Sequence, residues 1–287
     1  MRKTTFALAS IIAIALIFPA TSGNAIAETE DVSVYAEHAP ILIEGDDDFT
    51  PENGVTGGSG TELDPYIVEW WEINSFSSDG IKISDTTACL VIRNVVIYGG
   101  DSSFDAISLA GCSNVSISCC TVSSAGTGIN LVSSRDIIVS ENQVSLCLSD
   151  GIIVEASSRV QIIQNDIRFN NWAPFHDWPC GVLIESPDNP NTRSENVTIG
   201  GNIIQDNVGG AIGIGWLDDE TSDILVVANT LTGNEDGVWT FGTRKLVISG
   251  NQIEDNQWGV YLEHTQGAKV HSNNFVNNGL QGYDDWG

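Results

Sequence analysis

The sequence predicts an all-β fold: a single-stranded parallel β-helix, or solenoid, of about eight turns behind an N-terminal cap. Three observations predict it: a strand motif that recurs every 22 to 30 residues, two columns of aligned asparagines, and no sustained helical periodicity after residue 27. Runs of three or four residues that alternate apolar and polar side chains are typical of short strands with one buried face. Three such runs per unit fit one turn of a β-helix.

The strand motif is a small residue followed by an apolar residue, any residue and a second apolar residue. Its eight copies begin at Gly80, Ala106, Gly128, Gly151, Gly181, Ala211, Gly237 and Gly259. We therefore assign residues 80–287 to the repeats. Residues 28–79 do not repeat, and we assign them to a cap that covers the open apolar end of the first turn.

Each later unit also contains an asparagine at a fixed place after its second strand. This column holds Asn142, Asn165, Asn202, Asn229, Asn251 and Asn273, and a second column holds Asn170, Asn207, Asn234, Asn256 and Asn278. A buried asparagine at a bend satisfies its amide by bonding to the asparagines of the adjacent turns, which forms a ladder. Asparagine also tolerates the left-handed backbone that bends need. Both columns therefore indicate a structural role.

The first 27 residues have the pattern of a signal peptide. Arg2 and Lys3 precede an apolar run over residues 6–18, and small residues follow as far as Ala27. The alternative is a permanent anchor helix, but the run is short of the roughly 20 residues that span a bilayer. We expect cleavage after Ala27 and a secreted or cell-surface protein without a transmembrane segment.

The chain carries 38 acidic and 11 basic side chains, which gives a formal charge of −27. This charge argues against nucleic acid and against anionic membranes as partners, since both need a basic face. Cysteines in an exported chain often form disulfides, but Cys120 and Cys147 align with the asparagine columns and are expected to be buried there. The pairing stays open among Cys89, Cys112, Cys119, Cys120, Cys147 and Cys180.

Residues 39–49, 53–61 and 64–67, with the turns that follow, resemble the secreted right-handed parallel β-helix proteins of archaea. These proteins are often labelled NosD-like, after a periplasmic copper-binding protein, and have the pectate-lyase-like β-helix fold. The resemblance implies a right-handed β-helix for nearly all of the chain after residue 27. It leaves function open, because this fold hosts lyases, epimerases and adhesins. In such relatives a C-terminal cap follows the equivalent of residues 283–286, so we expect either an open last turn that can associate with a partner or a longer chain.

The resemblance implies copper as one ligand, and copper needs imidazole, thioether or thiolate donors. The only methionine is Met1, and the four histidines, which lack a convincing ligand spacing, are His38, His176, His264 and His271. We therefore expect no copper site and no other firm cofactor. Ca²⁺ is the remaining metal candidate, because acidic turns offer oxygen ligands. The two candidate sets are Asp46, Asp48 and Glu52, and Asp218, Asp219 and Glu220, although solvated acidic turns are the default interpretation.

Outward strand positions become aromatic and acidic in the later turns, and two long insertions flank them. We predict a ligand groove there, formed by Trp172, His176, Asp177, Trp178, Trp216, Asp218, Trp239, Phe241, Tyr261 and Glu263. Exposed aromatic rings beside carboxylates suit sugars, whose C–H faces stack on indoles while their hydroxyls bond to acids. The leading hypothesis is a cell-surface protein that binds carbohydrate or has a structural or adhesive role. The alternative is an aromatic patch that the insertions cover.

A polysaccharide hydrolase or lyase is the rival hypothesis. Glu155 and Glu185 occupy adjacent turns about 5 Å apart and are the candidate catalytic pair. Stacked carboxylates are common on such surfaces without catalysis, and the outer columns of the groove contain no Lys or Arg to act as a lyase base. We therefore expect binding rather than catalysis.

Overall fold

We describe the protein from a computed structural model. The described residues are 35–100, 103–172, 178–186, 193–215 and 221–284. The predicted signal peptide lies outside them. Among the described residues, no helix has the length and apolar character needed to cross a membrane.

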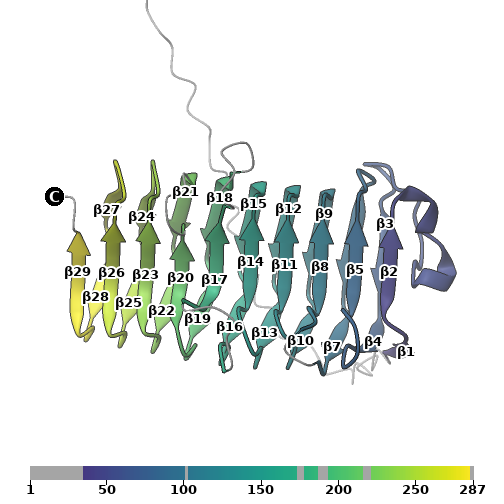
Figure 1. The fold of residues 1–287 in the computed structure, drawn as a ribbon, viewed down its shortest axis with the longest axis horizontal. Coiled ribbons are helices and arrows are strands. Elements are labelled where there is room, and N and C mark those ends of the chain that lie inside the picture. The colour runs from purple at the N-terminus through teal and green to yellow at the C-terminus, as the bar shows by residue number, and fades with distance from the viewer. Residues whose placement is uncertain (1–34, 101–102, 173–177, 187–192, 216–220, 285–287) are drawn as a thin grey trace, which may run out of the picture. The chain divides into compact units, whose positions relative to one another are not determined.

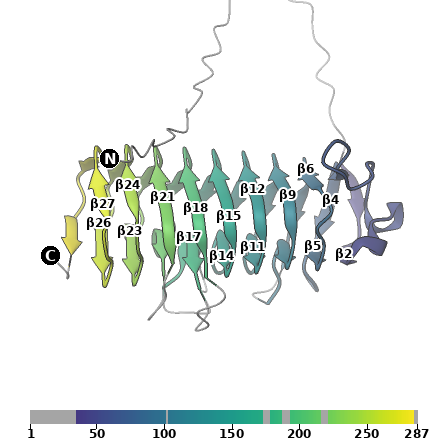
Figure 2. The ribbon, with the colours of Figure 1, turned by 90° about the horizontal axis from the view of Figure 1, so that it is seen from above.

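The described residues form three parallel sheets, here named A, B and C (Figures 1 and 2). Sheet A contains β1 (Ala36–His38), β4 (Trp71–Asn74), β7 (Val96–Tyr98), β10 (Thr121–Ser123), β13 (Gln143–Ser145), β16 (Asp166–Arg168), β19 (Ile203–Gln205), β22 (Thr230–Thr232), β25 (Gln252–Glu254) and β28 (Asn274–Val276). Sheet B contains β2 (Ile41–Glu44), β5 (Ile81–Ser84), β8 (Ile107–Ala110), β11 (Ile129–Val132), β14 (Ile152–Glu155), β17 (Cys180–Glu185), β20 (Gly210–Ile214), β23 (Asp236–Phe241), β26 (Trp258–Glu263) and β29 (Leu280–Asp284). Sheet C contains β3 (Tyr66–Glu69), β6 (Leu90–Arg93), β9 (Ser113–Ser118), β12 (Arg135–Ser140), β15 (Ser158–Ile163), β18 (Glu195–Gly200), β21 (Ser222–Val227), β24 (Val247–Ser249) and β27 (Lys269–His271).

Each strand pairs with the strand one turn earlier and one turn later, so equivalent residues stack in columns. Ile81, Ile107 and Ile129, for example, are successive partners, and all three are completely buried. Figure 1 shows the strands of sheet B side by side along the solenoid. The predicted all-β parallel solenoid of about eight turns is confirmed: the eight motif copies produce β5, β8, β11, β14, β17, β20, β23 and β26.

The structure adds a turn at each end of this series. Within the segment that the sequence assigned to the cap, β2, β3 and β4 pair in parallel with β5, β6 and β7. Two short 3₁₀ helices, η1 (Asp46–Asp48) and η2 (Pro51–Asn53), follow β2, and nearby Phe49 and Val55 join the core. At the other end, β29 pairs with β26 and extends sheet B by one strand.

The predicted asparagine ladder is present at the corner between sheets C and A. The side-chain amide of Asn202 donates to the side-chain oxygen of Asn229 at 2.9 Å and to the carbonyl of Ile162 at 2.8 Å. Its own oxygen accepts the backbone N–H of Asn165 at 2.8 Å. The second column forms the same contacts, as between Asn207 and Asn234 at 3.0 Å.

The ladder asparagines do not themselves adopt a left-handed backbone, contrary to expectation. The left-handed backbone belongs to the residue before each ladder asparagine, as at Glu141 (φ 57°) and Gly201 (φ 65°), and not to the asparagine itself. Asparagine is therefore required for its hydrogen bonds rather than for its tolerance of positive φ.

A third ladder, which the sequence did not reveal, uses hydroxyl groups. The backbone N–H of Ser134 donates to Ser157 Oγ at 2.9 Å, and that of Ser157 donates to Ser194 Oγ at 3.2 Å. Serine is too common in loops for this column to stand out in the sequence.

Each ladder begins after a buried cysteine. The backbone N–H of Cys112 donates to Ser134 Oγ, the first oxygen of the hydroxyl ladder. The backbone N–H groups of Cys120 and Cys147 donate in the same way to the first asparagine of each asparagine ladder, Asn142 and Asn170. All three side chains are buried, which agrees with the interpretation of Cys120 and Cys147 as small apolar residues. All six cysteines are free thiols in the structure, so none of the possible disulfides is formed.

Candidate functional site

On the outer face of sheet B, β20 carries a glycine where the adjacent strands carry larger side chains. Gly213 occupies an outward position between Leu183 of β17 and Trp239 of β23. A Cβ atom on Gly213 would lie 2.5 Å from Cys180 Sγ and 3.5 Å from the Trp239 ring. The turns on either side close over this gap, and the rings of Trp178 and Trp239 stack with centroids 5.5 Å apart and planes 5° from parallel.

Two adjoining cavities share this aromatic pair. Both are lined by Trp178, Glu235, Asp236 and Trp239, and their volumes are about 120 and 260 Å³. The larger cavity is completed by Trp258, Tyr261 and Glu263. We call the larger cavity, with these seven lining residues, the tryptophan pocket. It therefore combines four aromatic rings with three carboxylic acids.

The register of the parallel strands builds the pocket. Asp236 is the first residue of β23 and is the partner of Trp258 in β26, while Trp239 is the partner of Tyr261. Tyr261 in turn stacks on Tyr283 of β29, with centroids 4.9 Å apart, and Trp258 meets Tyr261 edge-on at 5.4 Å. The outward columns of three turns thus form one aromatic surface with Asp236 at its margin.

The acids give this pocket a negative charge. Burial is the main cause that raises the pKa of Asp236 to about 6, and the negative charge of neighbouring Glu235 adds to it. This carboxyl therefore titrates close to neutral pH. Within the described residues, neither Glu235 nor Asp236 forms an ion pair, and no Lys or Arg lines the pocket. Glu263 lies 3.9 Å from the ring nitrogen of the exposed His264.

Cys180 lies beneath the aromatic pair, where its thiol is buried. Burial raises the pKa of this thiol well above its usual value, and the charges of Asp150 and Asp236 act in the same direction. A thiol of this kind stays protonated and unreactive at neutral pH, so Cys180 fills space in the site and is a poor nucleophile.

The pocket unites four of the ten predicted groove residues: Trp178, Trp239, Tyr261 and Glu263. Phe241 instead stacks on His264 at 4.9 Å. The exposed Trp172 does not line the pocket and donates its indole N–H to the carbonyl of Phe169 at 2.6 Å. The other four, His176, Asp177, Trp216 and Asp218, lie outside the described residues.

Sequence reasoning missed Glu235, Asp236 and Trp258. They stand before the motif glycines of β23 and β26, whereas the groove residues predicted on these two strands all follow the glycine. A signal was available, because the residue directly before the motif is acidic in four turns, at Asp79, Asp105, Asp150 and Asp236. Stacked strands place these acids in one column along the same edge of sheet B.

The candidate catalytic pair lies elsewhere on sheet B. Glu155 of β14 and Glu185 of β17 are direct partners in adjacent strands, as the spacing predicted. Both are half-buried, and neither lines the tryptophan pocket.

The first Ca²⁺ candidate set uses two of its carboxylates in structural hydrogen bonds. Asp46 Oδ1 accepts from Thr86 Oγ1 at 2.5 Å, and Asp48 Oδ2 accepts from the backbone N–H of Glu44 at 2.9 Å, while Glu52 is exposed. Over the described part of the chain, no three His, Cys, Asp or Glu side chains are placed to share a metal ion. The second set, Asp218, Asp219 and Glu220, falls outside the described residues.

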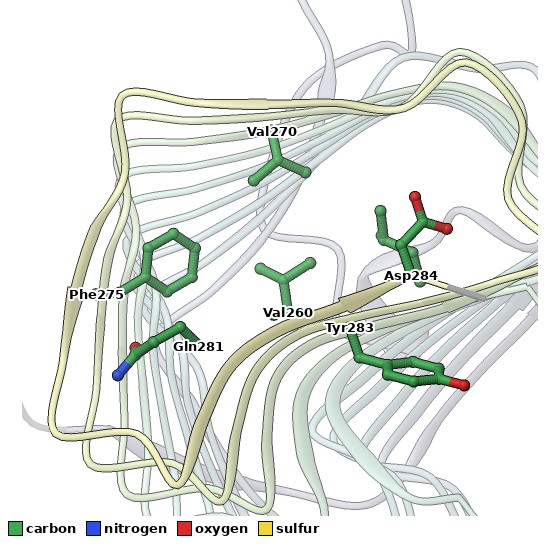
Figure 3. Close-up of a pocket in the computed structure, with 8 residues that line it drawn as sticks. Val260, Val270, Phe275, Gln281, Tyr283 and Asp284 are labelled. Carbon is green, nitrogen blue, oxygen red and sulfur yellow. The ribbon is translucent and has the colours of Figure 1, made fainter. Parts of the chain in front are cut away.

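A further cavity, of about 370 Å³, opens at the last turn. Figure 3 shows Val260, Val270 and Phe275 pointing into the space that this turn encloses. These side chains continue the inward columns of the core, so the cavity is an extension of the apolar interior rather than a polar recognition site. Association through this end stays a prediction.

Two solved structures with the same architecture resemble this chain. An exopolygalacturonase from Thermotoga maritima aligns with a TM-score of 0.63 and 18% identity over 74% of this chain, which spans about half (52%) of that enzyme. The A-module of a mannuronan C-5 epimerase from Azotobacter vinelandii aligns with a TM-score of 0.59 and 12% identity over 88% of each chain. At these identities the likeness shows the fold alone. No curated protein matches the chain.

Residues 190–286 also match the family described as periplasmic copper-binding protein (NosD). That matched segment contains no Cys or Met, and its only imidazoles are His264 and His271. His264 stacks on Phe241, whereas His271 lies on β27 of sheet C beside Ser272. This donor set does not fit a copper site, which needs several soft or imidazole ligands converging on one point.

A second family model, described as right handed beta helix region, matches residues 55–219, which is more than half of the chain. The match covers the turns in which all three corner ladders begin and agrees with the three parallel sheets of the structure. The predicted handedness and fold class are therefore confirmed. The chain belongs to the right-handed β-helix family.

Proposed function

We propose that this protein is an exported carbohydrate-binding β-helix and that it holds a segment of a glycan chain in the tryptophan pocket. One observation carries the proposal: four aromatic rings and three carboxylic acids line a single open hollow on the outer face of sheet B. The predicted signal peptide and the periplasmic family match of residues 190–286 support export.

The pocket has the two chemistries that sugar recognition needs. Trp258 and Tyr261 are half-buried, so each offers an exposed ring surface against which the C–H groups of a pyranose can pack. Carboxylates accept hydrogen bonds from sugar hydroxyls and fix the orientation of the ring. The edge-on contact between Trp258 and Tyr261 holds both rings in place before a ligand arrives, which lowers the entropy cost of binding.

The charge of the pocket selects among glycans. Polyuronates carry a carboxylate on each sugar, and Glu235, Asp236 and Glu263 would repel them. The proposal is therefore for a neutral or positively charged glycan.

Isothermal titration calorimetry against neutral, cationic and polyuronate oligosaccharides tests this function. Tyr261→Ala and Trp258→Ala are expected to weaken glycan binding about tenfold each, because each removes one stacking surface. Tyr98→Ala is the matched control, since Tyr98 is an exposed tyrosine on β7 of sheet A, away from the pocket. Equal affinity in Tyr261→Ala, Trp258→Ala and the control would refute the pocket as the site, and an absence of binding in the wild type would refute the function.

Hydrolysis of a glycan is a second candidate, favoured by the raised pKa of Asp236. A carboxyl with a pKa of about 6 is protonated in a useful fraction at neutral pH and can donate its proton to a glycosidic oxygen, with a second carboxylate of the pocket acting as base or nucleophile. Release of reducing ends from a bound oligosaccharide, abolished in Asp236→Asn with binding retained, would support it. Binding without any turnover would leave the protein as a binding module.

A further inference from the structure

We propose that the tryptophan pocket selects amino sugars, with the protonated ammonium group of one sugar seated among its rings and carboxylates. This inference rests on the proposed glycan-binding function and specifies the ligand class. It concerns the larger cavity, where Trp258, Tyr261 and Glu263 join the shared residues.

The charges around this cavity favour a cation. Glu235, Asp236 and Glu263 face one hollow of about 260 Å³, and no lysine or arginine lines it within the described residues. Burial raises the pKa of Asp236, and the Glu235 charge adds to the effect, so negative charge in the empty site has an energetic cost. A bound ammonium group removes that cost, whereas a neutral hydroxyl does so only in part.

The rings add a second attraction for the same group. An ammonium ion within about 6 Å of an aromatic centroid is stabilised by the electron density of the ring face, most strongly by tryptophan. The Trp178 and Trp239 rings lie 5.5 Å apart and nearly parallel, so they contact each other and admit nothing between them. The ammonium therefore binds on the side where Tyr261, Trp258 and the acids face the cavity.

Binding of a cation is linked to the protonation of Asp236. A nearby positive charge lowers the pKa of Asp236, so the ligand expels the proton that the empty pocket retains up to a pH of about 6. The titratable groups around this carboxyl are Glu235 on its own segment, the Cys180 thiol on β17, and Tyr261 and Glu263 on β26. The affinity for a permanently charged ligand should therefore rise as pH increases through this region.

Three oligosaccharides of equal length distinguish this inference from the parent function. They are an oligomer of glucosamine, its N-acetylated neutral counterpart, and an N-trimethylated form whose charge does not depend on pH. Calorimetry of the glucosamine oligomer is done between the pKa of Asp236 and that of the sugar amine. We expect the two cationic oligomers to bind about tenfold more tightly than the neutral one, and added salt to reduce the difference.

Variants locate the effect within the pocket. Glu263→Gln and Glu235→Gln are expected to weaken binding of the cationic oligomers several-fold more than binding of the neutral oligomer, because each variant removes a charge and keeps a hydrogen-bond acceptor. Glu52→Gln is the control, because Glu52 is an exposed acid on η2 at the first turn. With the N-trimethylated oligomer, the rise in affinity through about pH 6 should disappear in Asp236→Asn.

Equal affinities for the charged and neutral oligomers would overturn the amino-sugar inference and leave glycan binding intact. A cationic preference that persists unchanged in Glu263→Gln and Glu235→Gln would overturn it as well, because general attraction to an acidic protein would then explain it. If none of the three oligomers binds, the proposed function fails together with the inference.

Discussion

The asparagine ladder should contribute strongly to stability in the middle of the solenoid and weakly at its last turn. Asn202→Ala removes four hydrogen bonds at a buried corner, two donated by the side-chain amide and two accepted by its oxygen. The backbone N–H of Asn165 loses this acceptor. Each lost hydrogen bond costs about 1 kcal/mol, and a buried polar group left unpaired costs more, so the expected loss is about 4 kcal/mol.

Asn273→Ala is the matched control in the last turn. The Asn273 side chain makes three hydrogen bonds of similar length, at 2.9 Å each, but it is only half-buried. Water can replace these contacts, so we expect a loss of about 1 kcal/mol.

Urea denaturation followed by far-ultraviolet circular dichroism measures both variants. Hydrogen exchange should locate the loss in the turns around Asn202, because neighbouring turns of a solenoid stabilise one another. If Asn202→Ala costs no more than Asn273→Ala, the asparagine ladder does not stabilise the corners and its regular spacing needs another explanation.

Three further outcomes are expected. A Cβ on Gly210 would lie 3.4 Å from its nearest atom, whereas a Cβ on Gly213 would lie 2.5 Å from Cys180 Sγ. Thermal melts should therefore find Gly210→Ala as stable as the wild type and Gly213→Ala destabilised by about 1–3 kcal/mol. Equal melting temperatures for the two variants would contradict the packing described beneath the aromatic pair. Asp236 has a raised folded-state pKa, so the folded protein binds this proton more tightly than the unfolded chain and loses stability as pH rises from about 4 to about 6. In thermal melts, the free energy of unfolding of Asp236→Asn should equal that of the wild type at about pH 4 and exceed it by about 2 kcal/mol near pH 7. A difference that does not change with pH would contradict this linkage. Mass spectrometry of thiol alkylation should find the exposed Cys119 modified rapidly. Burial raises the pKa of Cys147 to about 12, so this thiol should be modified only when the protein unfolds. Early modification of Cys147 would show that the interior opens.

The fold could be predicted from the sequence because each turn repeats the same constraints. A ladder asparagine such as Asn202 must recur at a fixed place, and inward strand positions must remain apolar, so spacing alone identifies the strands and their stacking order. The hydroxyl ladder escaped notice because Ser134 and Ser157 have no compositional contrast with ordinary turn residues.

The site could be predicted only in part. Register placed Tyr261 next to Trp239, so their shared surface followed from the sequence. Trp178 belongs to an insertion, so its stacking on Trp239 does not follow from the spacing of the repeats. The raised pKa of Asp236 depends on burial and on the charge of Glu235, and both are properties of the folded pocket.

A crystal structure of the protein soaked with a glucosamine oligomer would show directly whether the tryptophan pocket holds an amino sugar. We predict one sugar packed against Trp258 and Tyr261, with its ammonium group within hydrogen-bonding distance of Asp236 or Glu263. An oligomer bound elsewhere on the solenoid, with the tryptophan pocket empty at saturating concentration, would contradict it.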